Sequence, residues 1–219
     1  MDRGPLLRLS ASAAVREQRL AALAAERDPH HTRARAAVEE AQARGSLELA
    51  GVEPDAAAVR RLAAAARAVP PGARLDAGAL LAWHRAAVGA QGFRVGARGG
   101  GAPADRIEGR LAVLEEWLEE ASARELRPAQ QGALALARVA EIAPFEDGNG
   151  RVARLAAAHV MARAGARPPL LAAGDAERLR TAVAAAFALD TAPLVALLEE
   201  AAERALDVAL RALEGLATR

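Results

Sequence analysis

Alanine accounts for close to three in ten of the 219 residues, and this abundance restricts the fold more than any other feature of the chain. Alanine has the highest helix propensity of the amino acids. Aromatic side chains, which favour strands, are scarce, because Tyr is absent and Phe and Trp total five. The length suits one domain with a core of ordinary size. We therefore expect an all-α fold in one structural unit.

Leucine and alanine recur at helical spacing along most of the chain, and Gly, Pro and Asp residues mark the helix ends. Asp76 is expected to cap one helix through its carboxylate, and Gly45-Ser46 is expected to end another. The glycine-rich stretch 89–105 breaks the pattern and predicts a loop or a short β-hairpin. The expected helices span residues 11–27, 32–44, 53–68, 76–88, 106–123, 128–142, 149–164, 174–189 and 192–216.

The distribution of charge argues against nucleic-acid and membrane partners. The formal net charge is +1 and acidic residues are interspersed with the arginines, whereas a nucleic-acid surface needs a one-sided basic excess. No stretch of about 18 residues is free of charge, as a membrane-spanning helix would require. The N-terminal residues do not resemble a secretory signal, so we expect a cytoplasmic protein. Because the chain has no cysteine, disulfides are excluded.

The segment 142–154, with the sequence IAPFEDGNGRVAR, carries the clearest chemical signal. Its two glycines allow successive backbone N–H groups to converge on an anion, and the N-terminus of the helix that follows reinforces this site. Asp147 supplies a carboxylate suited to a Mg²⁺ ion bound to phosphates. Arg151 and Arg154 lie on one helix face and can both bind phosphate oxygens. The pattern indicates a nucleotide-phosphate site; the alternative is an ordinary turn beside a solvated helix face.

This segment resembles the signature of the Fic (filamentation induced by cAMP) family, His-x-Phe-x-(Asp/Glu)-Gly-Asn-Gly-Arg-x-x-Arg. Every fixed position matches except the first, where Ala143 stands in place of His. Weaker similarity extends over residues 80–170, where Gly92-Phe93-Arg94 resembles the Gly-(Phe/Tyr)-Arg of the family's flap. The resemblance implies three regions, which are N-terminal helices at 1–74, an all-helical Fic core at 75–172 and C-terminal helices at 173–219.

The resemblance also implies an activity. In that family the signature binds Mg-ATP, and its His acts as general base on a hydroxyl of a target protein, which attacks the α-phosphate so that AMP is transferred and pyrophosphate leaves. The flap at 92–104 would align a target segment by backbone pairing. The implied roles are Mg²⁺ binding for Asp147, phosphate binding for Gly148, Asn149, Gly150 and Arg151, orientation of the γ-phosphate for Arg154, and anchoring of the loop for Phe145.

Alanine at position 143 removes the group on which this chemistry depends. Its side chain cannot accept a proton, and general-base catalysis typically contributes about 10²–10⁴-fold. We therefore expect the chain to transfer AMP poorly or not at all. The residues considered as replacements and set aside are His159, about 15 Å along the next helix, His84, interpreted as structural, the surface pair His30-His31, and Glu141 and Glu146, which flank the loop.

A second departure concerns regulation. The run from Ser46 to Gly51, SLELAG, resembles the (Ser/Thr)-x-x-x-Glu-(Gly/Asn) pattern of the family's inhibitory helix, whose Glu pairs with the second signature arginine. Ala50 stands where that Glu would be, so we expect Arg154 to be free of this competitor; the alternative is an ordinary helix end with a glycine stop. Alanine at both positions fits two origins, engineered removal of base and inhibitor or natural divergence.

Two functional hypotheses follow from these residues. The first is a Fic-type protein adenylyltransferase that lacks its catalytic base, with Mg²⁺ as cofactor, ATP as substrate and the Ser, Thr or Tyr hydroxyl of a target protein as acceptor. The second is a non-catalytic pseudoenzyme that binds a nucleotide or a partner through the same fold. A third reading uses Asp147 or Glu146 on a different phosphate-containing substrate. A homo-oligomer through the outer helices is compatible with each hypothesis.

Overall fold

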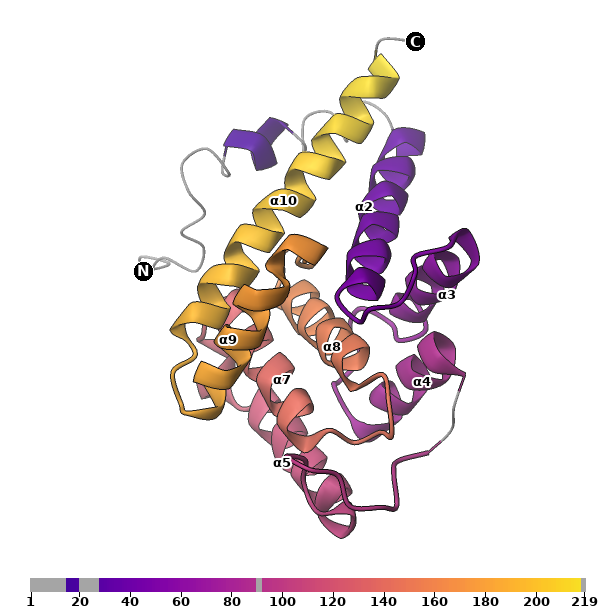
Figure 1. Cartoon of the computed structure of the whole chain (residues 1–219). Helices are drawn as coiled ribbons and strands as arrows, with labels where there is room; N and C mark the ends of the chain where they lie inside the picture. Colours follow the sequence, from indigo (N-terminus) through magenta and orange to yellow (C-terminus); the bar gives the residue numbers. More distant parts are fainter. Residues whose placement is uncertain (1–14, 20–27, 90–91, 218–219) are drawn as a thin grey trace.

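The computed structural model describes residues 15–19, 28–89 and 92–217, and within these ranges the chain is helical and contains no β-strand (Figure 1). Residues 15–19 are helical, and the rest of the helix expected at 11–27 lies outside the described residues. Each later expected helix has a counterpart, so the all-α prediction is confirmed. The described elements are α2 (Asp28–Glu48), α3 (Ala56–Ala66), α4 (Ala77–Val88), η1 (Ala104–Arg106), α5 (Ile107–Glu119), α6 (Ala121–Arg124), α7 (Pro128–Ile142), α8 (Asn149–Arg163), η2 (Ala173–Asp175), α9 (Ala176–Phe187) and α10 (Ala192–Ala217).

Helices α7 and α8 pack against each other at the centre of the molecule (Figure 1). Their facing surfaces are built from small side chains, which let the two backbones approach closely. A β-carbon on Gly132 of α7 would lie 2.6 Å from Cγ of Met161 in α8, so a larger residue here would force the buried Met161 side chain to shift. The fully buried alanines of the pair are Ala133, Ala135, Ala156 and Ala157. Alanine therefore serves close packing here as well as helix formation.

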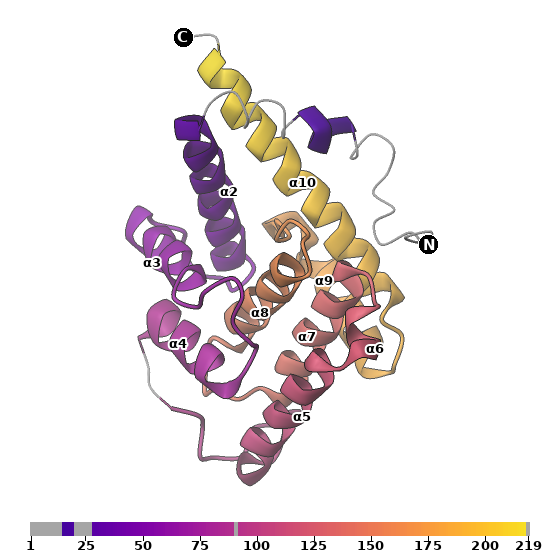
Figure 2. The ribbon, with the colours of Figure 1, turned by 180° about the vertical axis from the view of Figure 1, so that it is seen from behind.

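The other helices surround this pair. Helix α5 packs on α7 and α4 packs on α8, while α10 contacts α7 and α9 with its first half (Figures 1 and 2). Leu194, Leu197 and Leu198 of α10 belong to the main core. Leu206 and Leu210, further along α10, pack in a second cluster with α2. None of the described helices combines the length and the apolar character needed to cross a membrane.

Helix α2 continues through Gly45-Ser46 to Glu48, so the predicted break at this pair is wrong. The glycine serves a tertiary contact instead. A β-carbon on Gly45 would collide with the backbone carbonyl oxygen of Leu171. Glycine is therefore required where α2 passes the segment that follows α8, and helix-breaking propensity does not decide the local structure.

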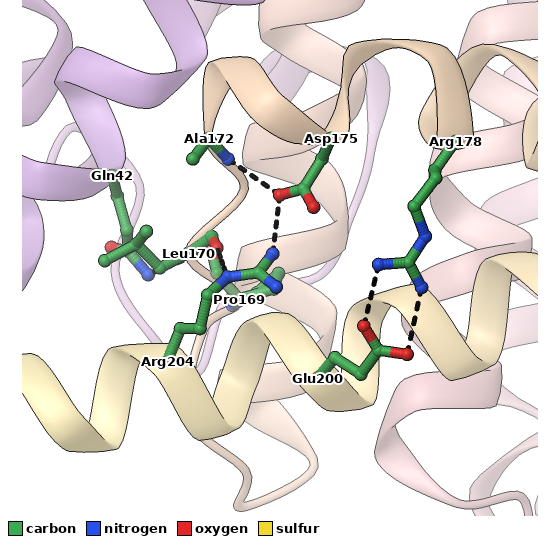
Figure 3. A network of polar contacts seen from close by, with 8 residues as sticks. All are labelled: Gln42, Pro169, Leu170, Ala172, Asp175, Arg178, Glu200 and Arg204. Carbon is green, nitrogen blue, oxygen red and sulfur yellow. Dashed lines mark hydrogen bonds and ion pairs between the residues drawn. The ribbon is translucent and has the colours of Figure 1, made fainter.

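A polar network fixes this same segment between α2 and α10 (Figure 3). Arg204 of α10 donates to the carboxylate of Asp175 at 2.5 Å and to the carbonyl of Leu170 at 3.2 Å. From the other side, Gln42 of α2 donates to the carbonyl of Pro169 at 3.2 Å. Arg178 and Glu200 add a two-pronged ion pair between α9 and α10. The network holds α2 in position beside α8.

Residues 106–123 form two helices rather than the single one expected. Glu120 has an extended backbone conformation (φ −69°, ψ 150°), which ends α5 before α6 begins. The break accompanies two ion pairs of the preceding residue, Glu119, to Arg124 at 2.8 Å and Arg163 at 2.5 Å. The side-chain pairing of Glu119 therefore joins both helices to α8.

The glycine-rich flap contains no strand within its described residues 92–105. Its backbone pairs with the loop at 143–148 and with the residue before that loop. The N–H of Arg94 donates to the carbonyl of Pro144 at 2.9 Å, and that of Ala102 to the carbonyl of Ile142 at 3.2 Å. Of the two alternatives, a loop or a hairpin, the described part of the flap is a loop.

Candidate functional site

The motif loop, residues 143–148, connects the C-terminus of α7 to the N-terminus of α8. Ala143 ends α7 in the left-handed region (φ 47°, ψ 63°), and Gly148 adopts the same region immediately before α8 (φ 72°). Asn149 closes the loop, since its side chain accepts from the N–H of Phe145 at 2.9 Å and donates to its carbonyl at 2.7 Å. The side-chain amide of Asn149 thus shapes the loop, and its backbone N–H belongs to the first turn of α8.

Phe145 is the hydrophobic anchor of the loop and is completely buried. Its ring stacks face to face on the ring of His84, with a centroid distance of 3.8 Å and an interplanar angle of 3°. Phe93 of the flap contacts the same ring at a centroid distance of 5.5 Å. The loop, the flap and α4 therefore meet around one aromatic side chain.

His84 is the residue at this site that sequence reasoning missed. It is 3% exposed, as expected of a structural histidine, but it contacts the loop directly. Its Nε2 lies 3.2 Å from the carbonyl oxygen of Asp147 and 3.8 Å from the carboxylate oxygen Oδ1. The two residues are 63 positions apart, so no local pattern could have paired them. The one available signal was a single imidazole on a largely apolar helix, next to Arg85.

Two charged side chains lie at the mouth of the loop. The side chain of Asp147 is 67% exposed, and its Oδ2 lies 3.6 Å from Nη2 of Arg151. The Arg151 side chain is only 13% exposed, and its Nε is buried with no hydrogen-bond partner among the described residues. A buried N–H donor without an acceptor is costly, so this guanidinium is poised to accept an anion.

Arg154 lies one turn further along α8, and its partner is α2 rather than solvent. Its guanidinium donates from Nε to the hydroxyl oxygen of Ser46 at 2.9 Å and from Nη2 to the carbonyl of Ser46 at 2.7 Å. Burial, reinforced by the charge of Arg151, lowers the pKa of Arg154 to about 10. Arg154 therefore remains charged at neutral pH. No carboxylate competes for Arg154 at position 50, where the residue is alanine. The Arg154 guanidinium is nevertheless hydrogen-bonded, because Ser46 accepts from it.

Ala50 and Gly51 lie in the turn that follows α2, where Gly51 has a positive φ of 66°. The N–H of Ala50 donates to the carbonyl of Leu47 at 2.9 Å. Of the expected regulatory segment 46–51, the first residue, Ser46, contacts Arg154 of α8. The last two residues, Ala50 and Gly51, form the turn after α2.

Arg94 lies in the flap, and its buried guanidinium donates to carbonyls of both the flap and the motif loop. The residue is 4% exposed. Its Nε donates to the carbonyl of Ala143 at 2.7 Å, and Nη1 donates to that of Gly96 at 2.6 Å. Nη2 donates to Ala102, and Ile142 is a longer partner at 3.4 Å. Arg94 therefore anchors the flap to the motif loop. Gly92, with φ of 83°, begins the described part of the flap.

Ala143 lies at the position predicted for the missing base and is 7% exposed. A β-carbon built on Gly101 would lie 3.3 Å from its Cβ, so the flap passes directly over it. Two of the other candidates, Glu141 and His159, are engaged elsewhere. Glu141 pairs with Arg138 at 2.5 Å. His159 binds the carbonyl of Ala73 at 2.8 Å. The side chains of His30-His31 lie outside the described residues.

The chain is similar to known proteins over this region. The Fic/DOC family model matches residues 74–161. Protein adenylyltransferase Fic from Drosophila willistoni is 33% identical over 112 residues, which cover 49% of this chain and 22% of that protein. Protein adenylyltransferase fic-1 from Caenorhabditis briggsae is 37% identical over 62 residues, covering 28% of this chain and 12% of that protein. The chain thus spans about a fifth or less of these relatives.

Two solved structures share the fold across most of the chain. A Fic domain containing signaling protein from Bacteroides thetaiotaomicron has a TM-score of 0.78 at 17% identity and covers 94% of this chain and 98% of its own. Fic-1 from C. elegans has a TM-score of 0.69 at 18% identity and covers 92% of this chain and 73% of its own. At these identities the similarity concerns the fold, including the helices outside the family match.

Proposed function

We propose that the site of this chain, whose residues 74–161 match the Fic/DOC family model, is that of a protein adenylyltransferase, which transfers AMP from Mg-ATP to a hydroxyl of a target protein. With Ala143 in place of the base, we expect the transfer to be very weak or absent. The observation that carries this proposal is the motif loop, where a carboxylate and a partly unpaired arginine meet the N-terminus of α8. The relatives named as protein adenylyltransferases support the same class of reaction.

The residues at the mouth of the loop fit a magnesium ion. Asp147 offers an exposed oxygen ligand. Mg²⁺ is usually held in nucleotide sites by one or two carboxylates together with phosphate oxygens and water. Asp147 would therefore hold the ion, and the ion would neutralise phosphate charge when it is bound. Arg151 is the neighbouring cation and would face the same phosphates.

Phosphate binding would fall to the first turn of α8. The initial N–H groups of a helix have no intrahelical partners and favour anions, and Gly148 with its positive φ turns the backbone into this position. A phosphate oxygen would supply the acceptor that the buried Nε of Arg151 lacks. For Arg154 to orient the γ-phosphate, its guanidinium would have to give up its hydrogen bonds to Ser46 and bind the phosphate oxygens instead.

The transfer step requires a proton acceptor. The hydroxyl oxygen of the target forms a bond to the α-phosphorus, the bond from that phosphorus to the bridging oxygen breaks, pyrophosphate leaves, and the hydroxyl proton must be taken up. Ala143 cannot accept it. His84 cannot replace it, because Nε2 contacts the carbonyl of Asp147 and Nδ1 is buried. With water as the remaining acceptor, loss of the base is expected to cost about 10²–10⁴-fold.

A nucleotide-binding pseudoenzyme is the second candidate. Two observations favour it, the methyl group at position 143 and the engagement of Arg154 by Ser46. Such a protein would bind ATP through the motif loop and α8 without transferring AMP. The adenylyltransferase and the pseudoenzyme would therefore bind the nucleotide at the same site.

Label transfer from ATP with a labelled α-phosphate separates the two candidates. The unmodified chain and its Ala143→His variant are incubated with a lysate, with Ala143→His/Asp147→Ala as the inactive control. His is tolerated in the left-handed region better than most residues, so the variant is expected to fold. Labelling by the His variant alone supports the adenylyltransferase. ATP binding without labelling in either protein supports the pseudoenzyme. Labelling by the unmodified chain contradicts the role assigned to the missing base.

A further inference from the structure

We propose that His84 is a positioning residue for Asp147, and that its contact with the backbone of Asp147 sets the affinity of the site for the divalent cation. The inference rests on the proposed function, because it assumes that Asp147 holds the ion. His84 belongs to α4, outside the motif loop, and it would act through the loop rather than on the nucleotide.

The geometry places a hydrogen-bond donor under the loop. Nε2 of His84 is 3.2 Å from the carbonyl oxygen of Asp147, whereas the carboxylate Oδ1 is beyond hydrogen-bond distance at 3.8 Å. A carbonyl can only accept, so the neutral ring must carry its proton on Nε2 to make this bond. Nδ1 is buried without a hydrogen-bond partner among the described residues, so Nε2 is the ring nitrogen that bonds the loop.

The ring is packed closely against the loop. It stacks on Phe145 at a centroid distance of 3.8 Å. A β-carbon on Gly148 would lie 2.6 Å from Cγ2 of Val88 and 3.5 Å from Cδ2 of His84, so α4 packs closely under the loop. The donor is therefore held in a fixed place relative to the loop, as a rigid supporting shell requires.

The carbonyl of Asp147 belongs to the peptide plane that joins Asp147 to Gly148. Gly148 has a positive φ of 72°, and glycine has access to several alternative backbone conformations. The His84 hydrogen bond restrains this part of the loop backbone, and without it the Cα of Asp147, which carries the carboxylate, is held less firmly in place. The side chain is otherwise held by one ion pair, to Arg151 at 3.6 Å, within the described residues.

Two substitutions at position 84 separate the donor from the ring. His84→Phe keeps an aromatic ring against Phe145 but removes the donor. His84→Gln removes the ring but can donate from an amide nitrogen near the place of Nε2. His159→Phe is the matched control, because His159 is also buried and also contacts a carbonyl, that of Ala73 at 2.8 Å, in a part of the fold away from the motif loop.

The measurement is Mn²⁺ binding to the protein–ATP complex, taken by isothermal titration as the gain in ATP affinity when EDTA is replaced by excess Mn²⁺. ATP affinity in EDTA is measured alongside it. His84→Phe is expected to weaken Mn²⁺ binding about tenfold, the effect typical of residues that orient metal ligands, and to leave metal-free ATP affinity unchanged. His84→Gln is expected to restore most of the Mn²⁺ affinity, and His159→Phe to bind Mn²⁺ as the unmodified chain does.

The outcomes distinguish this inference from the proposed function. If the unmodified chain binds neither ATP nor Mn²⁺-ATP, the proposed function fails. If it binds both and His84→Phe binds Mn²⁺ equally well, the positioning role of His84 is overturned. The inference is also overturned if His84→Phe loses metal-free ATP affinity to the same degree, or if His159→Phe loses as much Mn²⁺ affinity, since either result would indicate general loosening of the fold.

Discussion

Arg154 donates two hydrogen bonds to Ser46, one to the hydroxyl oxygen at 2.9 Å and one to the backbone carbonyl at 2.7 Å. The residues are 108 positions apart, and they meet because α2 runs on through Gly45 and passes close to α8. The second arginine of the signature is thus engaged by α2, even though Ala50 provides no carboxylate. Ala50 lies four residues after Ser46, in the turn that follows α2, and its resemblance to the Glu position of the inhibitory pattern makes it the place to test a carboxylate against Arg154.

Ala50→Glu is expected to weaken ATP binding by about tenfold, since a hydrogen bond to a charged group contributes roughly 1.5–3 kcal/mol. The added carboxylate would compete with the nucleotide for Arg154. Isothermal titration with Mg-ATP measures the effect. The neutral Ala50→Gln is the control and should bind ATP like the unmodified chain. Equal weakening by both substitutions would show that bulk, rather than charge, is responsible.

Arg94→Lys is expected to lower the free energy of unfolding by about 3 kcal/mol, because an ammonium group cannot reproduce the fork that a guanidinium offers to several carbonyls. Arg94 binds the carbonyls of Ala143 at 2.7 Å and Gly96 at 2.6 Å while almost completely buried. Urea unfolding measures the change. The exposed Arg98, which donates to the carbonyl of Glu146, provides the comparison, and Arg98→Lys should cost less than about 1 kcal/mol. A similar loss of unfolding free energy in Arg94→Lys and Arg98→Lys would contradict the stabilising role assigned to the Arg94 guanidinium.

Two helical glycines are expected to respond to alanine with opposite signs. Gly45→Ala should lower the free energy of unfolding by about 1–3 kcal/mol, because the new methyl group meets the carbonyl of Leu171. Gly109→Ala, in α5, should raise it by about 0.5–1 kcal/mol, because its β-carbon enters open space. Thermal and urea unfolding of both variants test this. Stabilisation by Gly45→Ala would mean that α2 does not pass Leu171 so closely.

Stability is expected to fall in mild acid because of His159. Burial lowers the pKa of His159 below its ordinary value of 6.5; the hydrogen bond to Ala73 opposes this shift, and the charge of Arg163 adds to it. Below pH 6.5 the unfolded chain therefore binds the proton more readily than the folded one, so the free energy of unfolding decreases as the pH falls from this value toward the lowered pKa. His159→Gln should flatten the pH profile of unfolding in this window. An unchanged profile would assign the acid sensitivity to other groups.

The amino-acid sequence alone determined the helical class and nearly all the helix positions. Abundant alanine, leucine at helical spacing and caps such as Asp76 act within a few residues, and α4 and α7 lie where these local signals put them. The run from Phe145 to Arg154 is also contiguous, so its match to the Fic signature could be read directly, including the alanine at position 143.

Tertiary structure alone decided which distant residues surround that run. Propensity predicted a helix end at Gly45, but close packing on Leu171 made the glycine part of a continuous helix. The flap motif predicted that Arg94 belongs to a segment that aligns a target through its backbone, and only the tertiary structure shows that the Arg94 side chain is buried and binds carbonyls of the flap and the motif loop. His84 and Ser46 reach the site only because α4 and α2 pack beside α8. Such contacts depend on how whole helices pack, and no pattern of neighbouring residues encodes them.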